Sequence, residues 1–334
     1  MLSAFIILII CLLLLFFFIY LRPRVRSKNY RKPDLSGQVA LVTGASKGLG
    51  KGIAIALGEC GACVYITART VKGRNSQDTK CLEDTAKQIE KAGGKAIIAQ
   101  CDHYDDKQVE QVFERIQKEQ GRLDILVNNV WAFPTHPTLE NPNPDVSFYG
   151  PNGLKDFDGC INIGVRSHLV CSRLAVPLMK KGKHGIIINT SSVGAKMSFL
   201  STAYTVGKSA LDRMVKEMAK EVKEFNITVV SLWPSLLKTE EISTMGKIFL
   251  DRFNLDINDF ETPLFVGRVV ANLVADKKIM SRTGKVIMTS TVCRKYGVLN
   301  TNGKWPFIPF LEPSTWGLMR LMFRSNPYKN FWGS

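Results

Sequence analysis

Short apolar runs alternate with longer amphipathic stretches along this chain from residue 38 onward. The apolar runs predict strands near residues 38–43, 62–68, 95–101, 123–128, 184–190, 226–232 and 284–289. The amphipathic stretches predict helices over residues 48–60, 77–92, 105–120, 155–181, 204–224 and 262–275. Strands and helices that alternate in this way are typical of a doubly wound parallel sheet, so the predicted fold class is α/β.

The first 21 residues form an apolar segment of their own. They carry no charged side chain and are mostly Leu, Ile and Phe. Because about 20 apolar residues span a bilayer as a helix, residues 1–21 are predicted to be a single transmembrane anchor. Six cations follow between residues 22 and 32, and basic flanks of this kind stay on the cytosolic side. The N-terminus is therefore expected in the lumen, and residue 22 onward in the cytosol.

The alternative is a cleaved signal peptide, which starts with a basic region and ends in a small-residue cleavage site. Here the basic block follows the apolar stretch and no A-x-A pattern comes after it, which favours an anchor. The chain then divides into an anchor (1–21), a basic stalk (22–34), one large α/β domain (35–304) and a tail (305–334). The aromatic and basic tail either lies in a membrane interface or packs over the domain or a dimer partner.

The chain is basic, with a formal net charge of +16 over 334 residues. A basic surface favours anionic headgroups and a phosphate-bearing cofactor, although solubility alone explains any single lysine equally well. No nucleic-acid-binding module is evident, so nucleic acid is not an expected partner. The eight cysteines and four histidines show neither a disulfide framework nor the spacing of metal ligands. We therefore expect no metal, and reduced thiols as in the cytosol.

A glycine-rich turn follows the first predicted strand. Its glycines let the backbone turn tightly and approach a phosphate, and the helix that follows directs its free N–H groups toward the same place. A strand, such a turn and a helix in this order suit the pyrophosphate of a dinucleotide. The predicted contacts are Gly44, Ser46, Lys47, Gly48, Leu49 and Gly50.

Tyr204 and Lys208 stand four residues apart, which places a phenol and an ammonium one turn apart on a helix face. A carbonyl that accepts hydride becomes an alkoxide and needs a proton, and Tyr204 is a suitable acid. Free tyrosine has a pKa of about 10, which the charge of Lys208 is expected to lower. An exposed helix pair would explain this spacing alone, but not the glycine turn that accompanies it. Together the two features predict hydride transfer.

Further residues stand in a fixed order along the chain, namely Asn128-Asn129, Asn162, Ser191-Ser192 and the stretch from Pro234 to Thr239. With the T-G-x-x-x-G-x-G spacing of the glycine turn and Tyr204-x-x-x-Lys208, they make residues 35–300 resemble the short-chain dehydrogenase/reductase family. The resemblance implies a Rossmann fold that uses a nicotinamide cofactor. Short stretches such as Ser231-Leu232-Trp233-Pro234 are similar to a membrane-associated member of that family.

The resemblance also implies four catalytic residues. Tyr204 would be the acid, Lys208 would act on Tyr204 and on the nicotinamide ribose, and Asn162 would hold a water that links Lys208 to solvent. A serine would donate a hydrogen bond to the carbonyl oxygen. Counting from the start of the fifth strand favours Ser192, whereas counting back from Tyr204 by the family interval favours Ser191. We take Ser192, because the strand fixes its position and loops absorb deletions.

The choice between NAD and NADP depends on charge at the end of the second strand. An acidic residue there would bond the ribose 2′-OH of NAD and repel the 2′-phosphate of NADP. This chain has Arg69 there and Lys47 in the glycine turn, which favours NADP(H), although both cations also fit an ordinary basic surface. By resemblance, the remaining cofactor contacts are Asp102 at the adenine, Asn128 on the ribose side, and Pro234 with Thr239 on the nicotinamide side.

Three features depart from the family pattern. Val130-Trp131 stands where the family continues Asn-Asn with Ala-Gly, which puts a bulky side chain near the floor of the site. Ser235 replaces a common glycine, and the loop 131–153 is longer than usual. These changes either reshape the substrate pocket or mark an inactive relative.

Taken together, the sequence predicts a membrane-anchored, NADPH-dependent carbonyl reductase or alcohol dehydrogenase. The expected substrates are apolar ketones or aldehydes such as steroids, retinoids, lipids or xenobiotics, because an anchor in the endoplasmic reticulum membrane places the site near lipid-soluble molecules. The lipid-droplet surface is another location, and a homodimer is compatible with the sequence. The alternative function is a catalytically weak membrane-bound scaffold that acts through protein partners, which the intact Tyr204–Lys208 pair disfavours.

Overall fold

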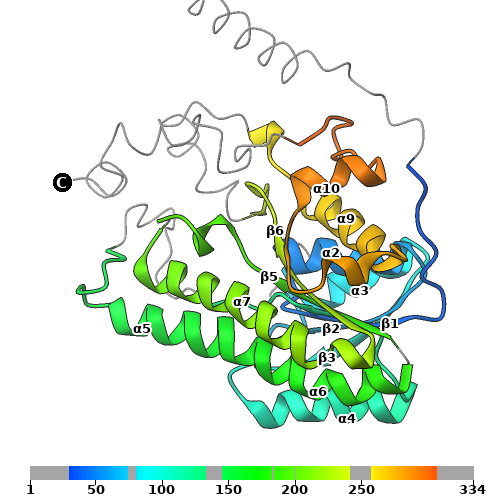
Figure 1. The fold of residues 1–334 in the computed structure, drawn as a ribbon, viewed down its shortest axis with the longest axis horizontal. Helices are drawn as coiled ribbons and strands as arrows, with labels where there is room; N and C mark the ends of the chain where they lie inside the picture. The colour runs from blue at the N-terminus through cyan, green and yellow to red at the C-terminus, as the bar shows by residue number, and fades with distance from the viewer. Residues whose placement is uncertain are drawn as a thin grey trace, which may run out of the picture. The chain divides into compact units, whose positions relative to one another are not determined.

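A sheet of seven parallel strands lies at the centre of the fold in the computed structural model (Figure 1). The strands are β1 (Val39–Thr43), β2 (Cys63–Ala68), β3 (Lys95–Gln100), β4 (Ile125–Asn128), β5 (Gly185–Thr190), β6 (Ile227–Trp233) and β7 (Val286–Met288). Their order across the sheet is β3-β2-β1-β4-β5-β6-β7, and every neighbouring pair is parallel. The predicted doubly wound parallel sheet is therefore confirmed. The strand order reverses between β1 and β4, and folds of this kind bind ligands beyond the carboxyl ends of the strands at that point.

The structure describes residues 30–73, 80–132, 145–182, 184–198, 200–240 and 257–306. By its internal contacts the chain divides into two units, Met1–Arg31 and Lys32–Ser334, and the sheet belongs to the second. The predicted anchor at 1–21, most of the predicted stalk and nearly all of the predicted tail lie outside the described residues. Within the described ranges, none of the helices is both long enough and apolar enough to cross a membrane.

Helices cover both faces of the sheet (Figure 1). One face carries α2 (Gly48–Glu59), α3 (Leu82–Lys91) and α9 (Pro263–Ala275), with α10 (Thr289–Tyr296) packed on α9. The other carries α4 (Asp106–Gln120), α5 (Gly153–Asp158), α6 (Ser167–Gly182) and α7 (Thr202–Glu221). A π-helix, Gly159–Arg166, joins α5 to α6. Short 3₁₀ helices occupy Val193–Ala195, Lys223–Phe225, Ile257–Asp259 and Ile279–Arg282.

The inner strands are apolar along their whole length because helices lie on both sides of them. Every residue of β1, β4, β5 and β6 is buried, so these strands appear in the sequence as continuous apolar runs. On one face, the core joins Leu41 and Tyr65 of the sheet to Phe113 of α4, Leu178 of α6 and Val215 of α7. Burying one such side chain contributes about 2 kcal/mol to folding.

Helix α2, which begins at the glycine turn, packs backbone to backbone on α9. A Cβ at Gly52 would lie 2.5 Å from the Cβ of Pro263, and a Cβ at Gly267 would lie 2.7 Å from the Cβ of Ala56. Only glycines let the two helices approach this closely. The position of the glycine turn is therefore fixed by α9 as well as by the sheet.

The predicted strands match the observed ones apart from a residue or two at most ends. The helix predicted over 155–181 is the main difference, because the π-helix interrupts it. There the N–H of Ser167 bonds to the carbonyl of Asn162, and Gly164 packs on the indole of Trp131, where a Cβ would lie 2.5 Å from Cε3. Helix α10 was not predicted, since its eight residues are too few to show a clear helical pattern.

Candidate active site

The glycine-rich turn joins β1 to α2 at the carboxyl edge of the sheet. Gly44 and Gly48 have φ angles of +67° and +55°, in the left-handed region that favours glycine. Asn129, which follows β4, braces the turn, because its side-chain amide donates to the carbonyls of Thr43 at 2.9 Å and Gly44 at 3.1 Å. The turn therefore has the open backbone and fixed shape that suit a phosphate group.

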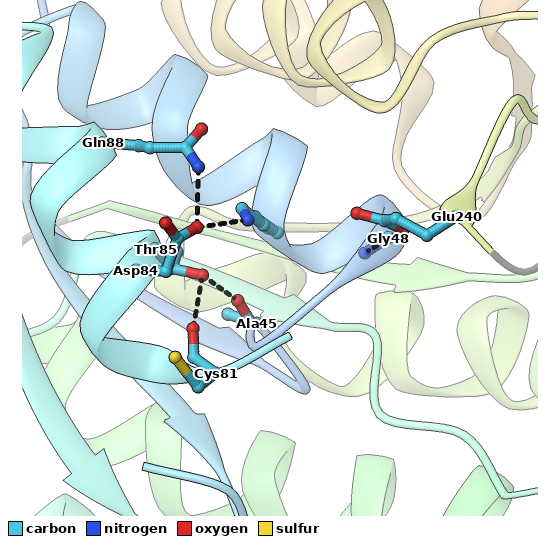
Figure 2. A network of polar contacts seen from close by, with 8 residues as sticks. Ala45, Gly48, Cys81, Asp84, Thr85, Gln88 and Glu240 are labelled. Carbon is cyan, nitrogen blue, oxygen red and sulfur yellow. Dashed lines mark hydrogen bonds and ion pairs between the residues drawn. The ribbon is translucent and has the colours of Figure 1, made fainter. Parts of the chain in front are cut away.

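Polar contacts also fix the turn against α3 (Figure 2). The hydroxyl of Thr85 donates to the carbonyl of Ala45 at 2.9 Å. The ammonium of Lys51 lies 2.5 Å from the carboxylate of Asp84, to which Gln88 donates at 2.7 Å. Because Lys51 is buried, its charge is compensated by this carboxylate rather than by bulk water.

The N-terminus of α2 binds a carboxylate from a distant part of the chain (Figure 2). The N–H of Gly48 donates to Oε2 of Glu240 at 3.2 Å. The first turn of α2 has no acidic residue of its own, and Lys47 at its N-cap makes no capping bond with its side chain. Because the positive end of a helix attracts anions, the Glu240 carboxylate marks an anion position in this site.

Other predicted cofactor residues stand at the same edge of the sheet. Lys47 directly precedes α2 and Arg69 directly follows β2, and both side chains are exposed. Ser46 and Leu49 are half-buried in and beside the turn. Asp102 lies just beyond β3, where its carboxylate accepts a backbone N–H of its own loop at 3.0 Å. The structure thus places these five residues around the carboxyl ends of β1, β2 and β3.

Asn128, at the end of β4, lies inside the fold. It is fully buried, and its amide donates to Oδ1 of Asn189 at 2.9 Å, to Oγ of Ser172 at 3.0 Å and to the carbonyl of His168 at 3.3 Å. These bonds tie β4 to β5 and α6. The side chain therefore has a structural role, and the predicted ribose-side contact of Asn128 stays a prediction.

The stretch from Pro234 to Thr239 runs from the end of β6 toward the glycine turn. Leu237 pairs with Glu261 in a parallel bridge, which holds the middle of the stretch. Beyond it, the methyl group of Thr239 would lie 3.7 Å from a Cβ placed on Gly48. The structure therefore brings this stretch, predicted for the nicotinamide side, next to the turn predicted for the phosphates.

Tyr204 and Ser192 are joined by a direct hydrogen bond, in which the phenol donates to Oγ at 2.9 Å. Ser192 directly follows the buried Ser191 at the end of β5. Tyr204 lies in the first turn of α7, where the hydroxyl of Ser201 caps the helix by accepting the N–H of Tyr204 at 3.2 Å. Gly194 makes room for the ring, because a Cβ there would lie 2.7 Å from Cε1 of Tyr204.

The structure separates the two candidate serines. The hydroxyl of Ser191 donates to the backbone carbonyl of Lys208 at 3.3 Å, inside the fold. The hydroxyl of Ser192 meets the phenol of Tyr204 instead. The geometry therefore favours Ser192 as the partner of the tyrosine, in agreement with counting from the strand.

Lys208 lies one turn beyond Tyr204 in α7, and its ammonium faces Trp131. Nζ lies 3.5 Å from the centroid of the indole and donates to the carbonyl of Thr190 at 3.3 Å. The indole also meets the ring of Tyr204 edge-on, with 5.7 Å between centroids. Gly207 gives it space, since a Cβ there would lie 2.8 Å from Cη2. Trp131 thus contacts both residues of the predicted pair.

Burial shifts the pKa values of both groups. It raises the pKa of Tyr204 to about 12, an effect that the hydrogen bond with Ser192 partly offsets, and it lowers the pKa of Lys208 to about 7. The expected lowering of the tyrosine pKa by Lys208 is therefore not found in this structure. The reason is that loss of hydration dominates, while the ammonium is turned toward Trp131. Perturbed groups of this kind cluster at functional sites.

Asn162 lies in the π-helix between α5 and α6, a kind of helix that is frequent at functional sites. Its carbonyl accepts the N–H of Ser167. Cys160 in the same segment lies 3.6 Å from a Cβ placed on Gly207, so the π-helix adjoins α7 next to Lys208. The water predicted to link Asn162 and Lys208 stays a prediction.

Comparison with known proteins agrees with this geometry. The family described as short chain dehydrogenase matches residues 38–247. The chain belongs to the short-chain dehydrogenase family. Dehydrogenase/reductase SDR family member 1 of Mus musculus is 34% identical over 279 residues, which cover 81% of this chain and 85% of that protein. The Homo sapiens protein of the same name is 33% identical over 278 residues, with the same coverage of 81% and 85%.

A solved structure of a metagenomic short-chain oxidoreductase, in complex with NADP, is similar to this chain with a TM-score of 0.57 and 27% identity. The similarity covers 76% of this chain and 96% of that one. Members of the short-chain dehydrogenase family are oxidoreductases that use nicotinamide cofactors, so the chain is a member of an oxidoreductase family. Within the described ranges, no group of three His, Cys, Asp or Glu side chains is placed to hold a metal ion.

Three contacts of the site were not predicted. Asn129 was noted only as part of the pair Asn128-Asn129, and its bonds to the glycine turn depend on how the chain after β4 packs against that turn. Glu240 was missed because no local pattern places it beside Gly48, far away in the sequence. Trp131 was noted as bulky, but its contact with Lys208 follows only from the packing of the π-helix against α7.

Proposed function

We propose that this protein is a membrane-anchored, NADPH-dependent carbonyl reductase, or an alcohol dehydrogenase in the reverse direction, that acts on apolar ketones or aldehydes. The observation that carries the proposal is the 2.9 Å hydrogen bond between Tyr204 and Ser192, with Lys208 one turn further along α7. An acid, a hydrogen-bond donor and a cation beside a dinucleotide turn suit the reduction of a carbonyl group.

When bound, NADPH supplies the hydride that reaches the carbonyl carbon. Tyr204 gives its phenolic proton to the carbonyl oxygen, and Ser192 donates a hydrogen bond to the same oxygen. The C=O π bond is thereby replaced by one C–H and one O–H bond, so the products are an alcohol and NADP⁺. Lys208 stabilises the phenolate left on Tyr204. To do so, the ammonium of Lys208 turns from Trp131 toward the phenolate oxygen.

The preference for NADP(H) is supported by the charges at the edge of the sheet. Arg69 directly follows β2, where an acidic residue would select NAD, and its guanidinium is exposed. A guanidinium binds a phosphate through two parallel hydrogen bonds, and the exposed Lys47 adds a second positive charge to the glycine turn. The metagenomic relative with the same fold binds NADP.

The apolar substrate class is supported by two features. Residues 1–21 are long and apolar enough to anchor the enzyme where lipid-soluble molecules collect. The indole of Trp131 also adds an apolar surface beside the reacting groups. We place the anchor in the endoplasmic reticulum membrane and the catalytic domain in the cytosol, because the cations at 22–32 resist translocation.

The test is NADPH consumption by the full chain in detergent micelles, with a panel of apolar ketones and aldehydes. We expect turnover that falls by several orders of magnitude in Tyr204→Phe, while NADPH still binds. Tyr65→Phe is a matched control, since it removes a hydroxyl that donates to Glu119 at 2.6 Å, outside the site.

Near wild-type turnover in Tyr204→Phe would remove Tyr204 from the mechanism. NADPH binding without turnover of any carbonyl would favour the alternative of a catalytically weak scaffold. Absence of binding of either NADPH or NADH would overturn the proposed function altogether.

A further inference from the structure

Asp212 stands one helical turn beyond Lys208 in α7, and its carboxylate is held against the sheet. Oδ1 accepts the hydroxyl of Ser231 at 2.6 Å and the indole N–H of Trp233 at 3.1 Å. Both donors belong to β6, where residues two apart point to the same face of the sheet. Since a hydroxyl and an indole are neutral, they fix the carboxylate in place without cancelling its charge.

The second oxygen of this carboxylate has no comparable contact. Oδ2 of Asp212 is buried, and it has no hydrogen-bond partner among the residues that the structure describes. The ion pairs of those residues do not include Asp212 either. Because a buried charge is costly unless an opposite charge compensates it, a cation is expected near this oxygen.

Lys208 is a buried cation in the complementary situation. It is only 6% exposed, and its ammonium contacts the carbonyl of Thr190 and the ring face of Trp131, neither of which carries a full charge. Within the described ranges it forms no ion pair. The cation and the carboxylate thus each lie inside the fold without a counter-ion in direct contact.

The helix and the sheet bring the two groups to the same place. Residues four apart in a helix lie on one face of it. Thr190, which accepts the bond from Lys208, pairs in the sheet with Leu232, which stands between the two donors to Asp212. Both side chains therefore end over the paired carboxyl ends of β5 and β6. Opposite charges shielded from water attract each other at such separations without touching.

The other titratable groups around Lys208 do not supply a negative charge. Burial raises the pKa values of Tyr204 and Cys160 to about 12 and lowers that of His168 to about 3, so these groups are neutral near pH 7. Burial also lowers the pKa of Lys208 to about 7, an effect that Cys160 and Asp212 oppose. Since the thiol is neutral, Asp212 is the charged group of these two.

Two further charged residues stand on elements that pack against α7. Lys196 follows the 3₁₀ helix Val193–Ala195 and is exposed, with its ammonium 5.8 Å from the centroid of the Trp233 ring. Asp156 of α5 is buried, and its charge raises the pKa of Cys160 in the π-helix. Asp156 is therefore the competing source of negative charge, and a test must include it.

We propose that Asp212 is a positioning residue that keeps the ammonium of Lys208 charged inside the fold, so that Lys208 can stabilise the phenolate of Tyr204. The inference rests on the proposed function, because that function gives Tyr204 and Lys208 their roles. Phenol, ammonium and carboxylate then follow one another at four-residue intervals along one face of α7. The carboxylate acts through the lysine and does not touch the substrate.

The test is the titration of Lys208 in the full chain in detergent micelles, without cofactor. It is followed by NMR of isotope-labelled lysine, and the signal is assigned by its absence in Lys208→Arg. Asp212→Asn keeps an oxygen for Ser231 and Trp233 but carries no charge, whereas Asp212→Glu keeps the charge. Glu221→Gln is the matched control, because it removes one negative charge at an exposed position of the same helix.

We expect the titration midpoint of Lys208 to fall by about one pH unit in Asp212→Asn and to stay nearly unchanged in Asp212→Glu and Glu221→Gln. The alkaline limb of kcat/KM should move by the same amount, so that activity above the limb falls about tenfold and activity below it changes less than about twofold. A merely structural role would lower activity at every pH. If Asp212→Asn does not fold, Asp212→Ser, which is smaller and also neutral, carries the same expectation.

An unmoved or raised midpoint in Asp212→Asn would overturn this inference and leave the proposed function intact. A larger fall in Asp156→Asn than in Asp212→Asn would also overturn it, because the charge would then come from α5. Absence of turnover with every carbonyl would overturn the proposed function, while the titration still shows whether Asp212 acts on Lys208. The two failures are therefore distinguishable.

Discussion

The ammonium of Lys208 lies 3.5 Å from the centroid of the Trp131 indole, closer than the 5.6 Å to the centroid of Tyr204. Trp131 follows β4 and Lys208 belongs to α7, so the contact joins two elements that are distant in the sequence. The face of an indole carries negative potential and stabilises a cation that has lost its water. The ring therefore supports the charged form of a lysine whose burial opposes that form.

Replacement of Trp131 by leucine should lower the pKa of Lys208 below its present value of about 7. The lost contact is worth about 0.5–2 kcal/mol, or about one pKa unit, because leucine fills the space without offering a ring face. The alkaline limb of the turnover profile should then move to lower pH. Trp131→Phe keeps a ring face and should keep the limb in place. An unmoved or raised limb in Trp131→Leu would show that water, rather than the ring, supports the charge.

Ser192→Ala should lower turnover about a hundredfold, because the reacting oxygen loses a donor at the moment when charge develops on it. Ser191→Ala should keep most of the turnover and instead lose about 1 kcal/mol of stability with its buried bond to Lys208. Steady-state kinetics of both variants measures the loss of turnover, and thermal unfolding measures the loss of stability. The reverse pattern would assign the catalytic role to Ser191.

Arg69→Asp should weaken NADPH binding by about ten- to a hundredfold and change NADH binding little, because only NADPH places a phosphate against the new carboxylate. The measurement is the dissociation constant of each cofactor. Arg213→Asp is the matched control, since its side chain is 76% exposed on α7. An unchanged ratio of the two affinities would mean that Arg69 does not contact the 2′-phosphate of NADPH.

Glu240→Gln should tighten both NADPH and NADH by about two- to fivefold. The carboxylate now occupies the N–H of Gly48, and an anion at a helix N-terminus is worth about 0.3–1 kcal/mol. Removal of its charge frees that position for a cofactor phosphate. Glu224→Gln, at an exposed site, is the control. Weaker binding in Glu240→Gln would mean that the carboxylate supports the cofactor instead of competing with it.

The protein should resist alkaline carbonate extraction from microsomes, and protease added to intact microsomes should digest its α/β domain. The apolar segment 1–21 and the cations at 22–32 are the reason. Asn226 offers an internal check, because it is exposed and begins the glycosylation sequence Asn226-Ile227-Thr228 that a lumenal domain would present. Full protection of the domain, glycosylation of Asn226, or a mature N-terminus after residue 21 would contradict this topology.

The parts of the fold that the sequence predicts well are those set by local pattern. Strands buried on both faces produce continuous apolar runs. The glycine turn and the Tyr204–Lys208 pair are also recognisable because each lies within a few consecutive residues. The contacts of Trp131, Glu240 and Glu261 depend on which helix faces which, and no local pattern reports that. The sequence also led us to expect a lowered pKa for Tyr204. The Tyr204–Lys208 spacing shows that a positive charge is near, but it does not show that burial removes the water around the phenol.

The position of β1 inside the sheet, between β2 and β4, also determines how the protein can form during its synthesis. β1, β2 and β3 are consecutive along the chain and adjacent in the sheet, so they can pair as soon as they leave the ribosome. The other edge of β1 has no partner until Ile125–Asn128 is made, and at about 5–20 residues per second it stays open for several seconds. An apolar strand edge exposed for that time invites pairing with other chains. The nascent protein thus carries its glycine turn, and an open strand edge beside it, well before Tyr204 has been translated.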